Sequence, residues 1–184
     1  MRIIISGGGT GGHVYPALTV ARALLGDRQA AEAADNDREP EILYVGSKGG
    51  VEESLVTRQR LPLEVIPAGG VRGLAPWKVA INLSKLARGF LSARRIVRRF
   101  APHVVFVTGG YVCTPVALAA WLQKVPVMIY LPDLEPGLAI RALSRLASRV
   151  AVSFPEAAGF FAKEKAFVSG YPVREAFLTA DKAT

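Results

Sequence analysis

The first sixteen residues read MRIIISGGGTGGHVYP (residues 1–16), and this stretch decides the fold. An apolar strand, Ile3 to Ile5, runs into five glycines around Thr10, and His13 and the start of a helix follow. Glycine permits positive φ angles and lets backbone N–H groups approach a ligand closely. The helix points the positive end of its dipole at the same place. The loop therefore predicts a site for an anion, with a phosphate or diphosphate as the expected ligand.

The loop differs from the usual nucleotide-binding patterns. Gly7, Gly9 and Gly12 spell G-x-G-x-x-G, but an NAD site also needs an acidic residue at the end of the second strand. Here that strand, 42–45, is followed by Gly-Ser-Lys at 46–48, and the Gly-Lys-Ser/Thr of a P-loop is missing from the first loop. A nucleotide-binding module unrelated to lipids is therefore disfavoured. The other alternative is a tight strand–helix turn without a ligand.

Composition bounds the class of protein. A chain of 184 residues, 51% of them hydrophobic, predicts one domain with a sizeable core. No apolar run approaches the ~18 residues of a membrane span, and Ile3–Ile5 is too short for the core of a signal peptide. The one cysteine, Cys113, excludes an internal disulfide and fits a reducing cytoplasm. A helix start can lower a thiol pKa, although a small packed residue is the simpler interpretation of Cys113.

Strand-like and helix-like segments alternate along the chain, which predicts an α/β fold with a doubly wound, mainly parallel sheet of the Rossmann-like type. The expected strands are short apolar runs that suit burial on both faces, at 2–6, 41–45, 63–66, 104–108, 125–130, 149–153 and 166–169. The expected helices cover 15–34, 51–60, 77–100, 115–124 and 137–147. Ligands bind at the carboxyl ends of such strands, so we expect a site built from loops 7–13, 46–49, 67–76, 109–114 and 131–137.

The net charge of +8 is concentrated in and just before the helix 77–100. Residues 71–100 hold eight of the 23 basic residues and no acidic one, so the remaining 15 basic residues balance the 15 acidic ones. A basic excess confined to one stretch predicts a polyanionic partner at that stretch.

Helical spacing divides the helix 77–100 into two faces. One apolar stripe is expected to pack on the sheet, namely Val79, Leu83, Leu86, Phe90, Ala93, Val97 and Phe100. The other side combines apolar and cationic residues suited to an anionic membrane surface, namely Leu74, Trp77, Lys78, Ile81, Lys85, Arg88, Arg95 and Arg99. A solvated basic face is the alternative. A nucleic-acid surface is disfavoured because no readable motif or aromatic series accompanies the charge.

Three segments of this chain together resemble the MurG-type transferases of glycosyltransferase family 28. They are GGTGGHVYP at 8–16, GGYV at 109–112 and GYPVR at 170–174. Weaker matches join them, namely Gly46 followed by Glu52 and Leu55-Val56, and GVRG at 70–73. The resemblance runs in order along essentially the whole chain.

The resemblance implies a GT-B architecture of two Rossmann-like domains. Residues 1–170 would be the N-terminal domain that binds acceptor and membrane, and 171–184 the start of the interdomain linker. The domain that binds UDP-N-acetylglucosamine would be absent from this chain, which is therefore expected to be inactive alone. The implied enzyme is an inverting hexosyltransferase of peptidoglycan synthesis. It would move N-acetylglucosamine to a polyprenyl-diphosphate muramyl lipid (lipid I to lipid II), as a peripheral protein on the cytoplasmic face of the membrane.

The resemblance also assigns roles to residues of the two glycine loops. The acceptor diphosphate would lie on Gly8, Gly9, Thr10, Gly11, Gly12 and His13, with Gly109, Gly110 and Tyr111 beside it. His13 would be the general base for the attacking hydroxyl, or a diphosphate ligand, since histidine titrates near neutrality. A histidine that only caps the helix is the alternative. No metal site, cofactor or nucleic-acid partner is expected.

One segment departs from the family pattern. Where the family carries His-Glu-Gln-Asn, this chain has Tyr-Leu-Pro-Asp at 130–133, and Tyr171 likewise replaces an asparagine. Asp133 and the nearby Glu135 can serve as base or sugar ligand, or can cap the next helix. Two further functions therefore stay open. The chain is either a relative that glycosylates another lipid, such as a diacylglycerol, or a non-catalytic membrane-docking subunit that needs a separate donor-binding chain.

Overall fold

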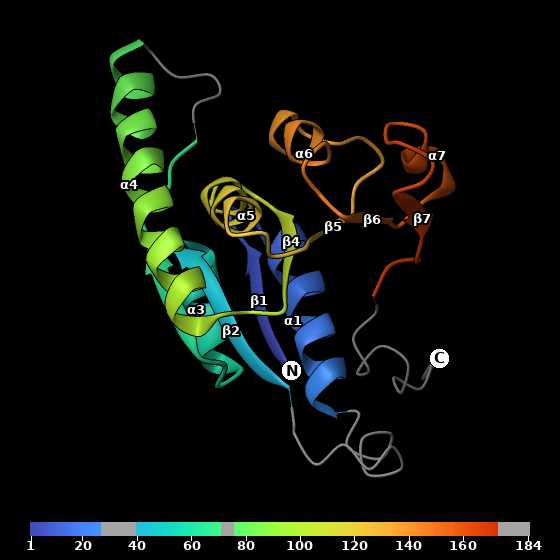
Figure 1. The fold of residues 1–184 in the computed structure, drawn as a ribbon, viewed down its shortest axis with the longest axis horizontal. Helices are drawn as coiled ribbons and strands as arrows, with labels where there is room; N and C mark the ends of the chain where they lie inside the picture. Colours follow the sequence, from blue (N-terminus) through green and yellow to red (C-terminus); the bar gives the residue numbers. More distant parts are fainter. Residues whose placement is uncertain (27–39, 71–75, 173–184) are drawn as a thin grey trace, which may run out of the picture.

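The apolar runs of the sequence form one seven-stranded sheet in the computed structural model, which describes residues 1–26, 40–70 and 76–172 (Figure 1). Runs of valine and isoleucine without polar alternation suit strands that are buried on both faces. The strands are β1 (Arg2–Gly7), β2 (Glu41–Ser47), β3 (Leu63–Ile66), β4 (Val104–Gly109), β5 (Val127–Leu131), β6 (Arg149–Val152) and β7 (Ala166–Val168). Each pairs in parallel with its neighbours.

The order of the strands across the sheet is β3-β2-β1-β4-β5-β6-β7. The chain moves outward from β1 to β3 and then returns to the other side of β1 with β4. This reversal places the topological switch point between β1 and β4, where doubly wound sheets bind their ligands. The predicted doubly wound fold is confirmed. It brings together the first glycine loop (residues 8–12) and the second glycine loop (residues 109–111), which follow these two strands.

Helices cover both faces of the sheet (Figure 1). One face is covered by α1 (Gly11–Gly26) and α3 (Val51–Arg58). The other is covered by α4 (Pro76–Phe100), α5 (Cys113–Leu122), α6 (Leu138–Leu143) and α7 (Pro155–Ala158). The sequence does not predict α7, whose four residues are too few for a periodic pattern. The predicted helix end at 34 and most of the predicted linker lie outside the described residues.

Helix α4 packs on the sheet along only part of its length. Ala93 and Val97 of the predicted stripe are buried, and Ile96 joins them in the core. The prediction for Leu83 is wrong, because this side chain is 62% exposed. The N-terminal part of α4 extends beyond the sheet, so its inward side finds no strand to cover (Figure 1). The side chain of Val79 lies outside the described part of the helix.

Gly89 allows α4 to approach the chain that leaves β3. A Cβ at this position would overlap the carbonyl oxygen of Pro67, which belongs to the backbone and cannot rotate away. The glycine is therefore needed for close packing, although glycine is unfavourable in a helix interior.

We expect Gly89→Ala to lower the free energy of unfolding by about 1–3 kcal/mol, because the added methyl group overpacks this contact. Urea denaturation followed by circular dichroism measures the change. Gly26→Ala is the matched control, since Gly26 is also helical and a Cβ there meets no atom within 4 Å. The control should be neutral or stabilising, and equal losses in both variants would contradict the packing argument.

Cys113 is a buried thiol at the start of α5. Its Sγ–H is placed to donate to the Gly109 carbonyl at 2.8 Å, and the Ser6 carbonyl lies 3.2 Å away. Burial raises the pKa of the thiol from 9.0 to about 11 and outweighs the lowering effect of these hydrogen bonds. The helix start therefore does not create a reactive thiolate, and the interpretation of Cys113 as a small packed residue is confirmed.

The raised thiol pKa makes stability depend on alkaline pH. The folded state keeps the proton that the unfolded thiol loses above pH 9.0, so this stabilisation is present below pH 9.0 and disappears as pH rises towards about 11. We expect the free energy of unfolding to fall by about 1 kcal/mol between pH 8 and pH 10. Urea midpoints at the two pH values should show a smaller fall in Cys113→Ala, and an identical fall would be incompatible with this origin.

Candidate anion-binding and catalytic site

The two glycine loops touch each other at the carboxyl edge of the sheet. The N–H of Gly8 donates to the carbonyl of Gly109 at 3.1 Å. Gly110 has a φ of +87°, and a Cβ there would overlap the carbonyl oxygen of Gly8. Glycine is therefore required at 110 both for the backbone conformation and for the close approach of the loops.

Each glycine loop ends at a helix N-terminus with unpaired backbone donors. In the first loop, the N–H groups of Thr10, Gly11 and Gly12 have no hydrogen-bond acceptor among the described residues. The same holds for Gly110 and Tyr111 in the second loop, within the same part of the chain. Helices α1 and α5 begin there, so their dipoles add positive potential to these donors. The arrangement can bind an anion with two phosphate groups.

Glu52 supports the first glycine loop from beneath. Its side chain is fully buried, and the carboxylate accepts hydrogen bonds from the N–H of Ser47 at 2.7 Å and of Gly9 at 3.4 Å. A Cβ on Gly8 or Gly50 would collide with this carboxylate, and one on Gly46 would collide with Cγ of the same side chain. Sequence reasoning gave Glu52 no role. The signal that could have found it is the pair of glycines, 46 and 50, just before an acid in the first turn of α3.

His13 lies over the second loop, and its contacts favour one tautomer. Its Nδ1 is 3.2 Å from the carbonyl oxygen of Gly8 and 3.2 Å from Oγ1 of Thr10. A carbonyl can only accept, so the contact with Gly8 favours the tautomer with the hydrogen on Nδ1 and a lone pair on Nε2. The ring lies against Gly109, where a Cβ would be 2.6 Å from Cδ2. Nε2 lies against the same glycine, 2.7 Å from that Cβ, but it makes no hydrogen bond within the described residues and can accept a proton.

The segment 130–135, whose sequence differs from the family pattern, brings one of its two acids close to His13. Oδ2 of Asp133 is 3.7 Å from Nε2 of His13, whereas Glu135 is exposed and makes no ion pair with another described residue. Leu131 is buried in the core, and the hydroxyl of Tyr130 is hydrogen-bonded to Oγ of Ser153 at 2.6 Å. Burial raises the pKa of Tyr130, so this phenol stays protonated and serves the packing.

Most of the described residues that were predicted to form the membrane-facing side of α4 are exposed. Trp77 and Ile81 are 66% and 52% exposed, and Lys85, Arg88 and Arg95 are exposed as well. Arg99 differs, because its guanidinium pairs with Glu64 of β3. Leu74 and the side chain of Lys78 lie outside the described part of the structure. No helix among the described residues is both long enough and apolar enough to cross a membrane.

A short chain of contacts joins α4 to the second glycine loop. Asn82 of α4 donates a hydrogen bond to the carbonyl of Gly70. The Cα of Gly70 lies directly against the ring of Tyr111, where any side chain would overlap. The exposed face of α4 and the anion-binding donors are therefore held in one relative position.

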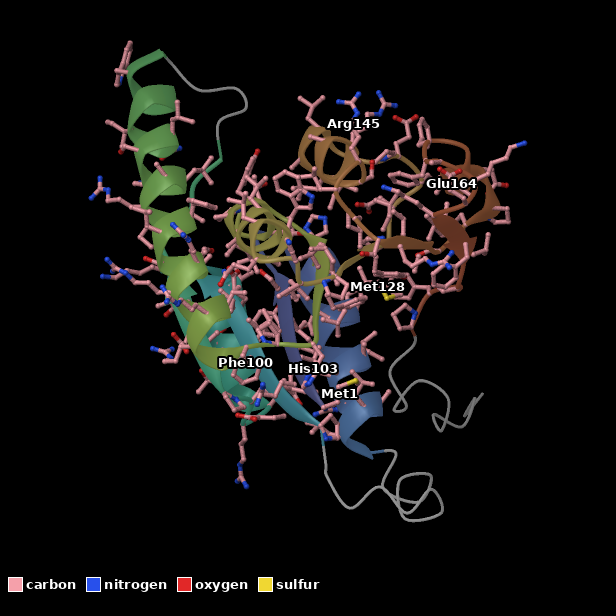
Figure 2. The ribbon with its side chains drawn as sticks, in the orientation of Figure 1. Met1, Phe100, His103, Met128, Arg145 and Glu164 are labelled. Carbon is pink, nitrogen blue, oxygen red and sulfur yellow. The ribbon has the colours of Figure 1, made fainter. Side chains whose placement is uncertain are left out.

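The cavity of about 370 Å³ on the α1 side of the sheet is a separate feature. Its walls include Met1 and Met128, which are labelled in Figure 2, together with Phe106 and Tyr130. None of the predicted site residues lines it, and its walls are almost entirely apolar. Among the described residues, no three His, Cys, Asp or Glu side chains could together hold a metal ion.

Comparison with known proteins places the chain in a family. Residues 3–152 match the glycosyltransferase family 28 N-terminal domain. A UDP-N-acetylglucosamine--N-acetylmuramyl-(pentapeptide) pyrophosphoryl-undecaprenol N-acetylglucosamine transferase of Desulforudis audaxviator is 46% identical over 180 residues, which are 97% of this chain and 46% of that protein. The enzyme of the same name from a Roseiflexus strain is 42% identical over 211 residues, or 99% of this chain and 48% of that protein. The chain thus spans about half the length of the curated relatives it matches.

Solved structures agree with the sequence comparison. The crystal structure of MurG from Acinetobacter baumannii matches with a TM-score of 0.73 and 28% identity, over 98% of this chain and 50% of that one. UDP-GlcNAc 2-epimerase from Methanocaldococcus jannaschii matches with a TM-score of 0.64, 15% identity and coverage of 93% and 46%, a likeness of fold alone. The sequence match, the fold and the two glycine loops lead to the same conclusion, that this chain belongs to glycosyltransferase family 28.

Proposed function

We propose that this chain is the acceptor-binding half of an inverting hexosyltransferase that moves N-acetylglucosamine from UDP-N-acetylglucosamine to a polyprenyl-diphosphate muramyl lipid. The observation that carries the proposal is the meeting of two glycine loops, whose unpaired N–H groups lie at two helix N-termini beside His13. The names of the relatives specify a pyrophosphoryl-undecaprenol acceptor, which has the diphosphate that these donors suit. A second part of the enzyme, outside this chain, would bind the UDP-sugar.

The chemistry follows from the position of His13. The acceptor hydroxyl attacks the anomeric carbon while its proton passes to Nε2 of His13. The bond between that carbon and the UDP oxygen breaks, and the departing diphosphate keeps the electron pair. The loop donors fix the acceptor diphosphate, so the hydroxyl is held near the base before the reaction begins.

The exposed side of α4 is proposed to dock on the cytoplasmic face of the membrane. Trp77 and Ile81 can enter the interfacial region while Lys85, Arg88 and Arg95 contact anionic headgroups. Arg99 is left out of this surface because it pairs with Glu64. The contacts through Gly70 would then hold the glycine loops at a fixed place relative to the lipid surface.

A different lipid acceptor is the second candidate function. It is favoured by the segment 130–133, where Leu131 is buried in the core and Asp133 faces His13. An additional carboxylate beside the base would change which sugar or alcohol can approach it. The diphosphate-binding loops favour the first candidate, because a diacylglycerol has no phosphate for them to bind.

We expect Gly11→Asp to weaken binding of a polyprenyl-diphosphate muramyl lipid in neutral vesicles at least tenfold. A carboxylate about 5 Å from the diphosphate would cost roughly 3 kcal/mol at an effective dielectric constant near 20. Gly11→Asn is the matched control, since it has the same size without the charge. Flotation of vesicles with and without the lipid gives the affinities. Equal binding by the Asp variant and the parent chain would place the diphosphate elsewhere.

A second flotation experiment tests the docking side of α4. Trp77→Ser should reduce partition into anionic vesicles without the diphosphate lipid by about tenfold, the effect of losing one interfacial aromatic. Trp121→Ser is the control, because Trp121 is also exposed but lies on α5 and not on α4. Raising the salt concentration should weaken the binding of both proteins. If the two substitutions act alike, the docking surface is not on α4.

A further inference from the structure

We infer that Asp133 is a positioning residue that acts through His13, by stabilising the charge that His13 acquires when it takes up a proton. The inference deepens the proposed function and rests on it for its role in transfer. Its physical basis is the pair of atoms Oδ2 of Asp133 and Nε2 of His13, which are 3.7 Å apart.

Asp133 does not stabilise the neutral imidazole of His13 by a hydrogen bond. The contact with the carbonyl of Gly8 favours the hydrogen on Nδ1 of His13, so Nε2 presents a lone pair. A carboxylate also has only lone pairs to offer. Two acceptors cannot form a hydrogen bond, so Asp133 does not hold the neutral imidazole.

Proton uptake changes the sign of the interaction. Once Nε2 has received the hydroxyl proton, the imidazolium carries a positive charge, and the carboxylate of Asp133 lies 3.7 Å from Nε2. The contact becomes an attraction between opposite charges that was absent before the transfer. An interaction that is stronger after the proton moves lowers the barrier to moving it, which is the condition for a contribution to rate.

The surroundings of His13 single out Asp133 for this role. From its own loop, His13 meets the carbonyl of Gly8 and the hydroxyl of Thr10, which are uncharged. From the second loop it meets Gly109. Glu52 is the other nearby acid, but its carboxylate is buried beneath the loop and bonded to Ser47 and Gly9. In the part of the chain that the structure describes, Asp133 is thus the charged group that faces Nε2.

The backbone holds Asp133 in place while its side chain reaches solvent. Leu131 and Pro132, which come just before it, are buried, whereas the side chain of Asp133 is 64% exposed. The side chain of His13 is only 25% exposed, and it lies between the two glycine loops. His13 is therefore the better placed of the two to touch an acceptor fixed by those loops, and Asp133 acts on it from outside.

Nitrogen-15 NMR of the His13 ring in this chain tests the charge coupling directly. At pH 6.5 we expect the neutral form to be the Nδ1–H tautomer. The ratio of imidazolium to neutral imidazole should fall about three- to tenfold in Asp133→Asn, as expected for loss of one partly exposed charge pair. Glu135→Gln removes the same charge from the same loop without a contact to His13, and it should change the ratio less than twofold. An unchanged ratio in Asp133→Asn, or the same change in both variants, would overturn the inference.

A second measurement follows transfer by the whole enzyme that carries this chain. Asp133→Asn should lower kcat about tenfold while leaving binding of the diphosphate lipid unchanged, because the loop donors remain. In a His13→Ala background the same substitution should have no further effect, whereas an additional loss would make Asp133 a base in its own right. The NMR result does not depend on transfer. A coupled His13–Asp133 pair in a chain that fails to bind the lipid would therefore refute the proposed function and leave the charge coupling intact.

Discussion

The contact between Gly8 and the second glycine loop is the constraint on which the site depends. The hydrogen bond from Gly8 to Gly109, and the close approach of Gly110, leave no room for a Cβ between the loops. Since the loops follow neighbouring strands at the switch point, the sheet fixes the distance between two helix N-termini. The unpaired backbone donors of both loops therefore lie at the same edge of the sheet.

A buried acid beneath a site for an anion requires an electrostatic explanation. Glu52 lies in the first turn of α3, where the helix dipole favours a negative charge, and it accepts hydrogen bonds from neutral donors. By binding the N–H of Gly9 it occupies one donor of the loop, whereas the next three N–H groups have no acceptor among the described residues. The negative charge of Glu52 would repel an anion bound at the loop. The dipoles of α1 and α5 would counteract this repulsion.

The sequence predicts the sheet well because its strands are short apolar runs between helices, a pattern with few alternative folds. It also predicts that both glycine loops lie at the carboxyl edge of the sheet, and the family resemblance implies that they lie side by side. The predicted burial of Leu83 on α4 is wrong, because helical periodicity indicates which side of a helix faces inward but not where the sheet ends. The pairing of Arg99 with Glu64, and of Asp133 with His13, depends on loops whose paths no local pattern specifies. The roles of the site residues stay predictions.

The N-terminal part of α4, which extends beyond the sheet, would link the proposed membrane contact to the glycine loops. A helix packed on the sheet along its whole length would bury Leu83, whereas here Leu83 is exposed together with Trp77 and Ile81 of the outer side. The same part of the helix holds Gly70 through Asn82, and Gly70 packs on Tyr111 of the second glycine loop. A polyprenyl diphosphate has its charge at a fixed distance from the lipid surface. If the protein docks through α4 as proposed, its backbone donors need to lie at a matching distance from the lipid surface, and this chain of contacts would set that distance.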